Sequence, residues 1–262
     1  MSAYIAILSA RIRTLLQYRT AALAGTVTQL FWGLIRTMLF AALYSSSSTV
    51  QPMTESEAIN YVWLGQAMFA VSLVSIDNDF RVMVRNGTVA YELLRPIDLY
   101  SFWYCRAIAN RFALVLLRTM PVLSIALFLG LKPPVSLAAA AAWTLTTLGA
   151  FLLTSAISTL GSIAMVLTIE GEGINKILNV FILIFSGMIV PLPFFPDRLQ
   201  PILNFLPFRD IIDVPFQLYL GHIPPQEVLV LVFHQLAWIL AFVALGRLLL
   251  ASGIRRLVIQ GG

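Results

Sequence analysis

The chain has 262 residues, of which 59% are hydrophobic and 11% are charged. A soluble domain carries about 45–50% apolar and about 25% charged residues, so a mean hydropathy of +0.88 excludes an ordinary soluble protein and predicts an integral membrane protein. The net charge of +5 comes from basic residues between apolar runs, which argues against a nucleic-acid surface, and the single Cys105 excludes an intrachain disulfide.

The first predicted element covers residues 3–19 and is an amphipathic helix. One broad face of its helical wheel is apolar, and the opposite face holds Ser9, Arg13 and Gln17; the apolar positions are Tyr4, Ile5, Leu8, Ile12, Leu15 and Leu16. Such a helix lies in the membrane interface rather than crossing it, and Arg11 inside the apolar arc would have to snorkel. An ordinary cytosolic lead-in helix is the alternative.

Six apolar segments are each long enough to cross a bilayer, which needs about 20 mainly apolar residues. They cover residues 20–44, 58–80, 108–131, 136–168, 174–192 and 226–250. The first of them lacks a small-residue cleavage site, so we expect it to remain as a membrane span. The sequence therefore predicts one all-α transmembrane domain over residues 1–262.

Residues 81–107 form a structured connection between the second and third segments, because their valines and leucines are too apolar to stay solvated. Asn86-Gly87 is a turn signal, Thr88 could cap a short helix over 89–94, and Pro96 ends it. A short amphipathic helix between two spans suggests a docking site for another protein. The alternative is a local helix that packs under the membrane.

The long fourth segment carries small residues at every fourth position, and such a stripe lets another helix approach closely. Its members are Ala150, Thr154, Ser158 and Ser162. The stripe is consistent with packing inside the chain or across a dimer. The following EGEG sequence, with Glu170 and Glu172, predicts a break before the fifth segment.

The stretch SGMIVPLPFFPDRLQPILNFLPF, Ser186 to Phe208, contains five prolines yet stays apolar. Non-helical backbone at membrane depth needs protein or water partners, and prolines reduce that need because they lack an N–H group. We expect two short helices that enter the outer leaflet and return within region 191–220, with a turn at 196–198 and the second helix ending near Phe205. A purely interfacial loop is the alternative.

Orientation follows from the basic residues in the short connections. With the N-terminus inside, eleven basic residues are cytoplasmic and three are outside. The eleven are Arg11, Arg13, Arg19, Arg81, Arg85, Arg95, Arg106, Arg111, Lys176, Arg255 and Arg256; the three are Lys132, Arg198 and Arg209. Both termini are therefore predicted to be cytoplasmic, and the proline-rich stretch is predicted to be outside.

Charges inside the spans are candidates for a functional role, because a charge at the bilayer centre costs about 2.5–3.5 kcal/mol on insertion scales. Arg118 lies nearer the middle of its span than Arg36, which is expected near the outer interface. Asp77 and Asp79 are interpreted as helix caps beside Arg81 rather than as metal ligands, and no metal site is predicted.

Motifs for chemistry on this chain are missing from the sequence. It contains no G-x-x-x-x-G-K-[ST] loop for phosphate, no H-E-x-x-H and no G-x-S-x-G. The polar residues that an intramembrane enzyme acting on lipid or peptide would need have no known catalytic spacing; they are Asp77, Asp79, Glu170, Glu172 and His234. The chain is therefore not expected to be an enzyme.

Together these features resemble the membrane subunit of ABC-2 type exporters, in particular the small permeases encoded beside an ATPase. The most specific stretches are NGTVAYELLRPIDLY (86–100) and GMIVPLPFFPDRLQPILNFLPFRDIIDVPFQLYLG (187–221). The resemblance implies a bacterial inner-membrane permease that exports an amphipathic or hydrophobic substrate. It also implies two permeases, identical or paralogous, with two ATPase subunits that carry ATP and Mg. A non-transporting assembly or sensor subunit of the same fold is the alternative.

The resemblance also assigns roles to residues. The helix at 3–19 becomes the elbow helix, and the ATPase-docking coupling helix comprises Gly87, Thr88, Val89, Tyr91, Glu92, Leu93, Leu94, Arg95 and Pro96. The re-entrant gate comprises Pro191, Pro193, Phe194, Phe195, Pro196, Leu203 and Pro207. The candidates for the substrate path are Gln29, Phe31, Trp32, Arg118 and Phe181. This path is expected near a permease dimer interface, and membrane lipids are expected as further partners.

Overall fold

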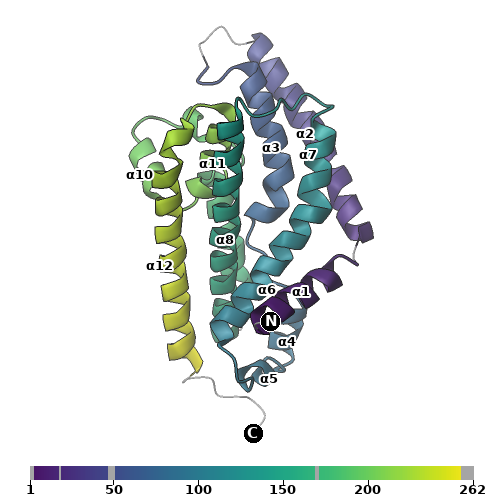
Figure 1. Ribbon diagram of the computed structural model, residues 1–262, viewed down its shortest axis with the longest axis vertical. Helices are drawn as coiled ribbons and strands as arrows, with labels where there is room; N and C mark the ends of the chain where they lie inside the picture. The colour runs from purple at the N-terminus through teal and green to yellow at the C-terminus, as the bar shows by residue number, and fades with distance from the viewer. Residues whose placement is uncertain (1–2, 18, 47–50, 169–170, 255–262) are drawn as a thin grey trace.

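The computed structural model describes residues 3–17, 19–46, 51–168 and 171–254, and every regular element in these ranges is helical (Figure 1). Helices suit this composition because they satisfy their own backbone groups in an apolar environment. In chain order they are α1 (Ala3–Leu15), α2 (Arg19–Ser46), α3 (Glu55–Ser72), α4 (Asn78–Arg85), α5 (Ala90–Leu93), α6 (Leu99–Leu114), the π-helix η1 (Val115–Thr119), α7 (Met120–Ala126), α8 (Leu137–Thr168), α9 (Gly171–Phe185), η2 (Leu192–Phe194), α10 (Gln200–Phe205), η3 (Arg209–Ile211), α11 (Asp213–Leu220), η4 (Pro225–Glu227) and α12 (Val228–Ile254).

Within the described ranges, four helices are long and apolar enough to cross a membrane. They are Arg19–Ser46, Leu99–Ala126, Leu137–Thr168 and Pro225–Gly253. The other two predicted segments are represented by α3, with 18 residues, and by α9, with 15 residues. The all-helical, multi-pass prediction is thus confirmed, whereas the count of six crossings stays a prediction.

Three predicted segments have bounds that differ from those of the observed helices. The segment 58–80 is not one helix, because α3 ends at Ser72 and Asp77 caps a new helix, α4. The third helix starts at Leu99 rather than 108, because the Asp98 carboxylate accepts a hydrogen bond from the Ser101 N–H and caps it. The fifth ends at Phe185 rather than 192, and Gly187 follows with a φ of 88° that favours glycine.

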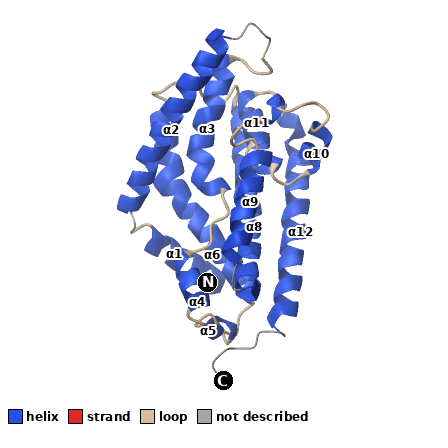
Figure 2. Cartoon of the chain, turned by 180° about the vertical axis from the view of Figure 1, so that it is seen from behind, coloured by secondary structure: helices blue, strands red, loops and turns tan. Residues whose placement is uncertain are grey.

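Helix α8 lies in the middle of the bundle and contacts α6, α9, α11 and α12 (Figures 1 and 2). Three members of its small-residue stripe, Ala150, Thr154 and Ser158, are buried. Thr154 and Ser158 accept hydrogen bonds from Arg111 of α6. This part of the stripe therefore serves packing within the chain.

The elements that the sequence singled out lie at the two ends of the long axis. Helices α1, α4 and α5 gather at the lower end in Figure 1, and α10 and α11 lie near the upper end. One apolar core cluster includes Trp63, Leu153 and Phe216, and a second includes Phe80 and Trp103. The Phe80–Trp103 cluster also holds Ile76 and Val89, so it supports the segment that joins α3 to α6.

Candidate functional site

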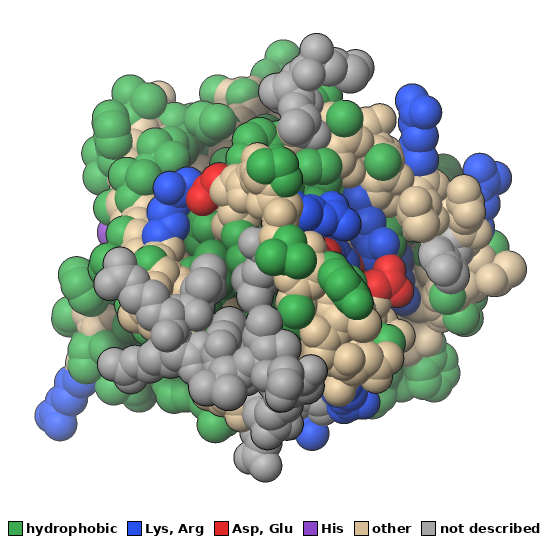
Figure 3. Space-filling model, turned by 90° about the horizontal axis from the view of Figure 1, so that it is seen from below, with side chains coloured by type: hydrophobic (Ala, Val, Ile, Leu, Met, Phe, Trp, Pro, Cys, Tyr) green, Lys and Arg blue, Asp and Glu red, His purple; other side chains and the backbone are tan. Residues whose placement is uncertain are grey.

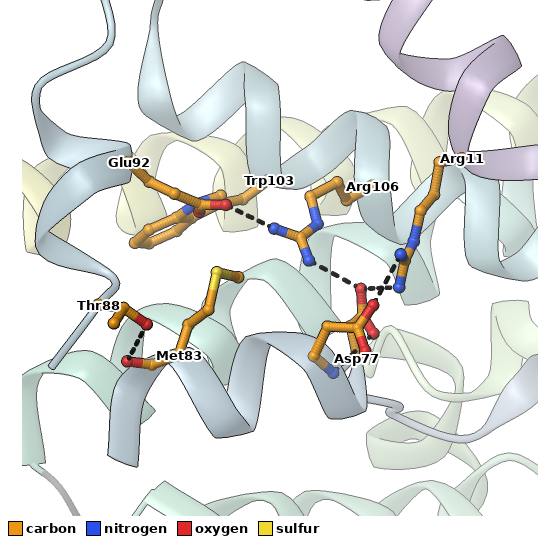
Figure 4. Close-up of polar contacts among 8 residues, drawn as sticks. Arg11, Asp77, Met83, Thr88, Glu92, Trp103 and Arg106 are labelled. Carbon is orange, nitrogen blue, oxygen red and sulfur yellow. Dashed lines mark hydrogen bonds and ion pairs between the residues drawn. The ribbon is translucent and has the colours of Figure 1, made fainter. Parts of the chain in front are cut away.

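The lower-end segment, residues 78–98, folds as two short helices and a turn. The Asp77 carboxylate accepts a hydrogen bond from the Asp79 N–H, 3.1 Å away, and so caps α4. Gly87 has a φ of 71°, which lets the chain reverse towards α5. The expected cap at Thr88 is wrong: its hydroxyl donates to the Met83 carbonyl, 3.4 Å away, and Val89 precedes α5 without a side-chain cap (Figure 4).

The predicted docking residues divide into an outer and an inner set. Six of them are exposed: Gly87, Thr88, Tyr91, Leu94, Arg95 and Pro96. Tyr91 is 73% exposed and Leu94 is 80% exposed, which is unusual for large apolar side chains on a polar end of a protein. Val89 is half-buried, Glu92 is buried, and the side chain of Leu93 lies outside the described set.

Glu92 points inward because two donors hold its carboxylate. Arg106 Nη1 of α6 lies 2.7 Å from Glu92 Oε1, and the Trp103 indole N–H donates to Glu92 Oε2 at 2.8 Å (Figure 4). Both partners come from α6, so the segment is fixed against that helix. A buried carboxylate with two such partners gives a well-defined orientation to the short α5 helix.

Arg106 extends these contacts to α4 and α1. Its Nη2 lies 2.9 Å from Asp77 Oδ2, and the same oxygen also forms an ion pair with Arg11 of α1. Arg11 Nη1 lies 2.8 Å from Asp79 Oδ2. This lower charge network, Arg11–Asp77–Arg106–Glu92, therefore connects α1, α4, α5 and α6 (Figure 4).

The lower charge network was not apparent in the sequence. Arg11 was expected to snorkel, and Asp77 and Asp79 were expected to cap a helix beside Arg81. The structure confirms the cap at Asp77 and also pairs both carboxylates with Arg11, which is 66 residues away from Asp77 along the chain. From below, basic and acidic side chains lie together among apolar ones on this face (Figure 3).

A more exposed ion pair marks the other side of the same end. Arg247 of α12 lies 3.2 Å from Asp98, and both side chains are about half exposed. Partial burial by itself would raise the pKa of Asp98, but hydrogen bonds from Ser101 and the charge of Arg247 outweigh it and lower that pKa. This pair is a useful comparison for the buried pairs of Arg106.

The link between α3 and α4, residues 73–76, is not helical although Val74 and Ile76 are buried. Arg111 Nη2 donates to the Leu73 carbonyl at 3.1 Å, and Ser158 accepts the Ser75 N–H at 3.2 Å. Asn179 of α9 holds both backbone groups of Val74, at 2.7 and 3.1 Å. Side chains of α6, α8 and α9 thus replace the hydrogen bonds that a continuous helix would make.

Arg111 was counted as a cytoplasmic residue from the sequence, but it is 2% exposed within α6. Its Nε donates to Thr154 Oγ1 at 2.7 Å, and its Nη2 donates to Ser158 Oγ at 2.8 Å. The expected start of the third span at 108 put Arg111 near a membrane surface. The earlier helix start at Leu99 carries it into the bundle.

We expect the change Asn179→Leu to destabilise the protein, because it removes both partners of the Val74 backbone. Each buried polar group left without a partner costs about 1–3 kcal/mol. The thermal unfolding midpoint of the purified chain should fall clearly below that of Asn204→Leu, which changes an exposed asparagine on α10. Equal midpoints for the two variants would contradict the role given to Asn179.

At the upper end, the proline-rich stretch folds as expected in its second half. Helix α10 ends at Phe205, and the turn that precedes it contains the exposed Pro196. The first expected helix is reduced to the three-residue η2, Leu192–Phe194. Of the gate candidates, Pro191, Leu203 and Pro207 are buried, while Pro193, Phe194 and Phe195 are half-buried.

Polar side chains of α12 hold this upper segment in place. His234 Nδ1 lies 2.6 Å from Asp210 Oδ2, and the Trp238 indole N–H donates to the Phe205 carbonyl at 3.1 Å. Gln235 donates to the carbonyls of Thr146 and Asp210, both at 3.0 Å. His234 therefore serves packing between α12 and the upper segment.

Two clefts lie along α2, and the candidate path residues are divided between them. Gln29 and Trp32 line the upper cleft, of about 300 Å³, together with Arg36, which donates to the Met188 and Ile189 carbonyls. Arg118 lines the lower cleft, of about 350 Å³. Phe31 is 60% exposed and Phe181 stacks on Phe185 and Phe208; neither lines these two clefts.

The comparisons with known proteins give one finding. A family model described as ABC-2 family transporter protein matches residues 30–261, which includes α3 to α12 and most of α2. Comparison with curated proteins and with solved structures gives no match to this chain. The match spans most of the chain and includes the lower-end segment, the upper segment and part of the lining of both clefts, and the chain therefore belongs to the ABC-2 family of transporter membrane proteins.

Proposed function

We propose that this chain is the permease subunit of an ATP-binding cassette exporter, which moves an amphipathic or hydrophobic substrate outward by alternating access. Family membership supports a transport component that works with an ABC ATPase. The observation that carries the finer proposal is the lower-end segment, which presents exposed Tyr91 and Leu94 while its Glu92 is fixed to α6. A short helix that is fixed to α6 and exposes two large apolar side chains is suited to bind another subunit and to receive force from it.

In this proposal the lower-end segment is the coupling element, and the ATPase binds it from the cytoplasm with its ATP and Mg. A movement of α5 would reach α6 through Glu92 and Arg106, and α1 through Asp77 and Arg11. Helix α1 would act as the elbow helix in the membrane interface. The basic lower end and the two chain termini would then lie in the cytoplasm, at the inner membrane of a bacterium.

The working unit in this proposal has two permeases and two ATPase subunits. Helix α2 has one strongly apolar exposed side, with Val27 66% and Met38 72% exposed, and α9 exposes Ile177 and Val180. A second permease, identical or paralogous, would pack beside α2 and α9, and lipid would cover the remaining apolar surface. The upper cleft with Gln29 and Trp32 would then lie close to that contact.

The upper segment is proposed to close the outer end of the path. Replacing residues 193–207 with a polar linker of equal length is expected to abolish export, because the linker cannot pack Leu203 and Pro207 against the bundle. Export of the substrate and ATP turnover should be measured together in proteoliposomes. The double change Pro196→Ala with Pro201→Ala, at exposed positions, should keep export; unchanged export in the linker variant would remove the gating role.

The experiment that tests the function is isolation of the native complex from the membrane, followed by identification of its subunits and bound molecules. Reconstituted with the ATPase that accompanies it, the chain should move the bound molecule only when ATP is hydrolysed. An isolated chain that is fully active without any ATPase would overturn the proposal.

A further inference from the structure

The lower cleft contains an arginine whose charge no ion pair within the described residues balances. The cleft lies between the start of α2, the link after α3, and the α6–η1 helix, and Arg118 is part of its wall. Within the described residues, Arg118 forms no ion pair, and its Nη2 is 3.5 Å from the Ala21 carbonyl. Its buried Nε has no hydrogen-bond partner.

Asp77 is the one acidic residue among those that line this cleft, and it is already engaged. Its Oδ2 is shared by Arg11 and Arg106. The other polar lining residues, Ser75, Asn78 and Asn110, are neutral. Among the charged side chains that line the lower cleft, Arg118 is therefore the one without an ion-pair partner in the described residues.

Two backbone features aim the Arg118 side chain at α2. Residues Val115–Thr119 form a π-helix turn, a rare irregularity that changes side-chain direction and is frequent at functional sites. On the facing helix, Gly25 leaves space for the guanidinium: a Cβ there would lie 2.5 Å from Arg118 Cζ. The backbone of η1 and the space at Gly25 of α2 therefore together fix the position of the Arg118 charge.

With α1 in the membrane interface, as proposed above, the lower cleft lies near a lipid boundary. Gly25 follows Arg19, the first residue of α2, by six residues or about 9 Å at 1.5 Å per residue. With α1 in the interface, that distance corresponds to the boundary between headgroups and acyl chains of the inner leaflet. The wall beside Arg118 is apolar and includes Ala113, Leu114 and Leu117.

We propose that the lower cleft binds an anionic amphiphile from the inner leaflet, with Arg118 in direct contact with its phosphate or carboxylate headgroup. An intramembrane charge in a wet or open site marks a substrate path more often than a structural role. The acyl chain of the ligand lies along the apolar wall at Leu114 and Leu117. The claim that this amphiphile belongs to the transported substrate class depends on the proposed function. The claim that the lower cleft binds it does not.

The test uses the full-length purified chain without any ATPase, and native mass spectrometry to count bound lipids. Phosphatidylglycerol should be retained over phosphatidylcholine, and Arg118→Gln should reduce that preference about tenfold, as expected for one lost hydrogen-bonded charge contact. Arg118→Lys should keep most of the preference. The matched control is Arg247→Gln, an exposed arginine at the same end, which should leave the preference unchanged.

Other outcomes would overturn the proposal. An unchanged lipid preference in a folded Arg118→Gln variant would do so. If the oligomeric state of that variant also changed, Arg118 would contact a second chain and not a lipid. Displacement of phosphatidylglycerol by an equal concentration of glycerol phosphate would point to a soluble anion instead of a lipid.

A second variant covers the case in which Arg118→Gln does not fold. Leu117→Trp keeps the charge and fills the lower cleft, so it should also weaken retention of phosphatidylglycerol; full retention would contradict the site. Since binding is measured without ATP, intact binding with no ATP-driven transport would refute the proposed function alone. Transport without charge-selective binding would refute this site alone.

Discussion

Leu94→Asp is expected to abolish ATP-driven transport while leaving the membrane helices folded. Leu94 is 80% exposed at the tip of the lower-end segment, so the change should cost the isolated chain little. In the complex, the leucine would be buried against the ATPase. Burying a leucine contributes about 1.5–3 kcal/mol, and burying an unpaired carboxylate is strongly unfavourable. A loss of ATPase affinity of at least about 100-fold follows from the two effects together.

The measurement is ATPase affinity and transport in the same reconstituted preparation. Leu137→Asp is the matched control, because Leu137 is 91% exposed at the start of α8, where an aspartate is favourable. Tyr91→Asp should behave like Leu94→Asp, since Tyr91 shares the exposed surface. Normal transport in a folded Leu94→Asp variant would exclude the lower-end segment as the ATPase contact.

Arg106→Met is expected to destabilise the lower end more than any exposed charge change. The substitution leaves Glu92, whose side chain is 5% exposed, without its cationic partner. It also removes the ion pair between Arg106 and Asp77. Removing one partner of a buried ion pair costs about 3–5 kcal/mol. For a chain of this size, that loss corresponds to a fall in the unfolding midpoint of roughly 10 °C.

Arg247→Met is the matched control, because it breaks the exposed pair with Asp98 and such pairs contribute about 0–1 kcal/mol. Thermal unfolding of both variants and of Arg106→Met with Glu92→Gln should be compared. The double variant should recover part of the lost stability, since the neutral glutamine no longer needs a cation. Equal midpoints for Arg106→Met and Arg247→Met would show that the lower charge network contributes little.

The sequence was informative wherever local chemistry decides the outcome. Apolar length predicted α2, α8 and α12 closely, and amphipathic spacing predicted α1. The prolines of the upper stretch predicted a turn and a helix that ends at Phe205, as α10 does. These features depend on neighbours within a few residues, so a single sequence contains the evidence for them.

Features that depend on distant residues were missed. The break after Ser72 has no proline or glycine to announce it, and its backbone partners Arg111, Ser158 and Asn179 lie 38 to 105 residues away. Arg111 was assigned to the cytoplasm because loop charges and buried charges look alike in a sequence. A count of basic residues per loop cannot find either feature, because both depend on which helices become neighbours.

The break between α3 and α4 also limits how the protein can move. Its backbone is fastened to three helices at once, by Arg111, Ser158 and Asn179, so none of the three can slide without stretching these bonds or carrying the others with it. Helices α6, α8 and α9 should consequently travel as a single rigid block.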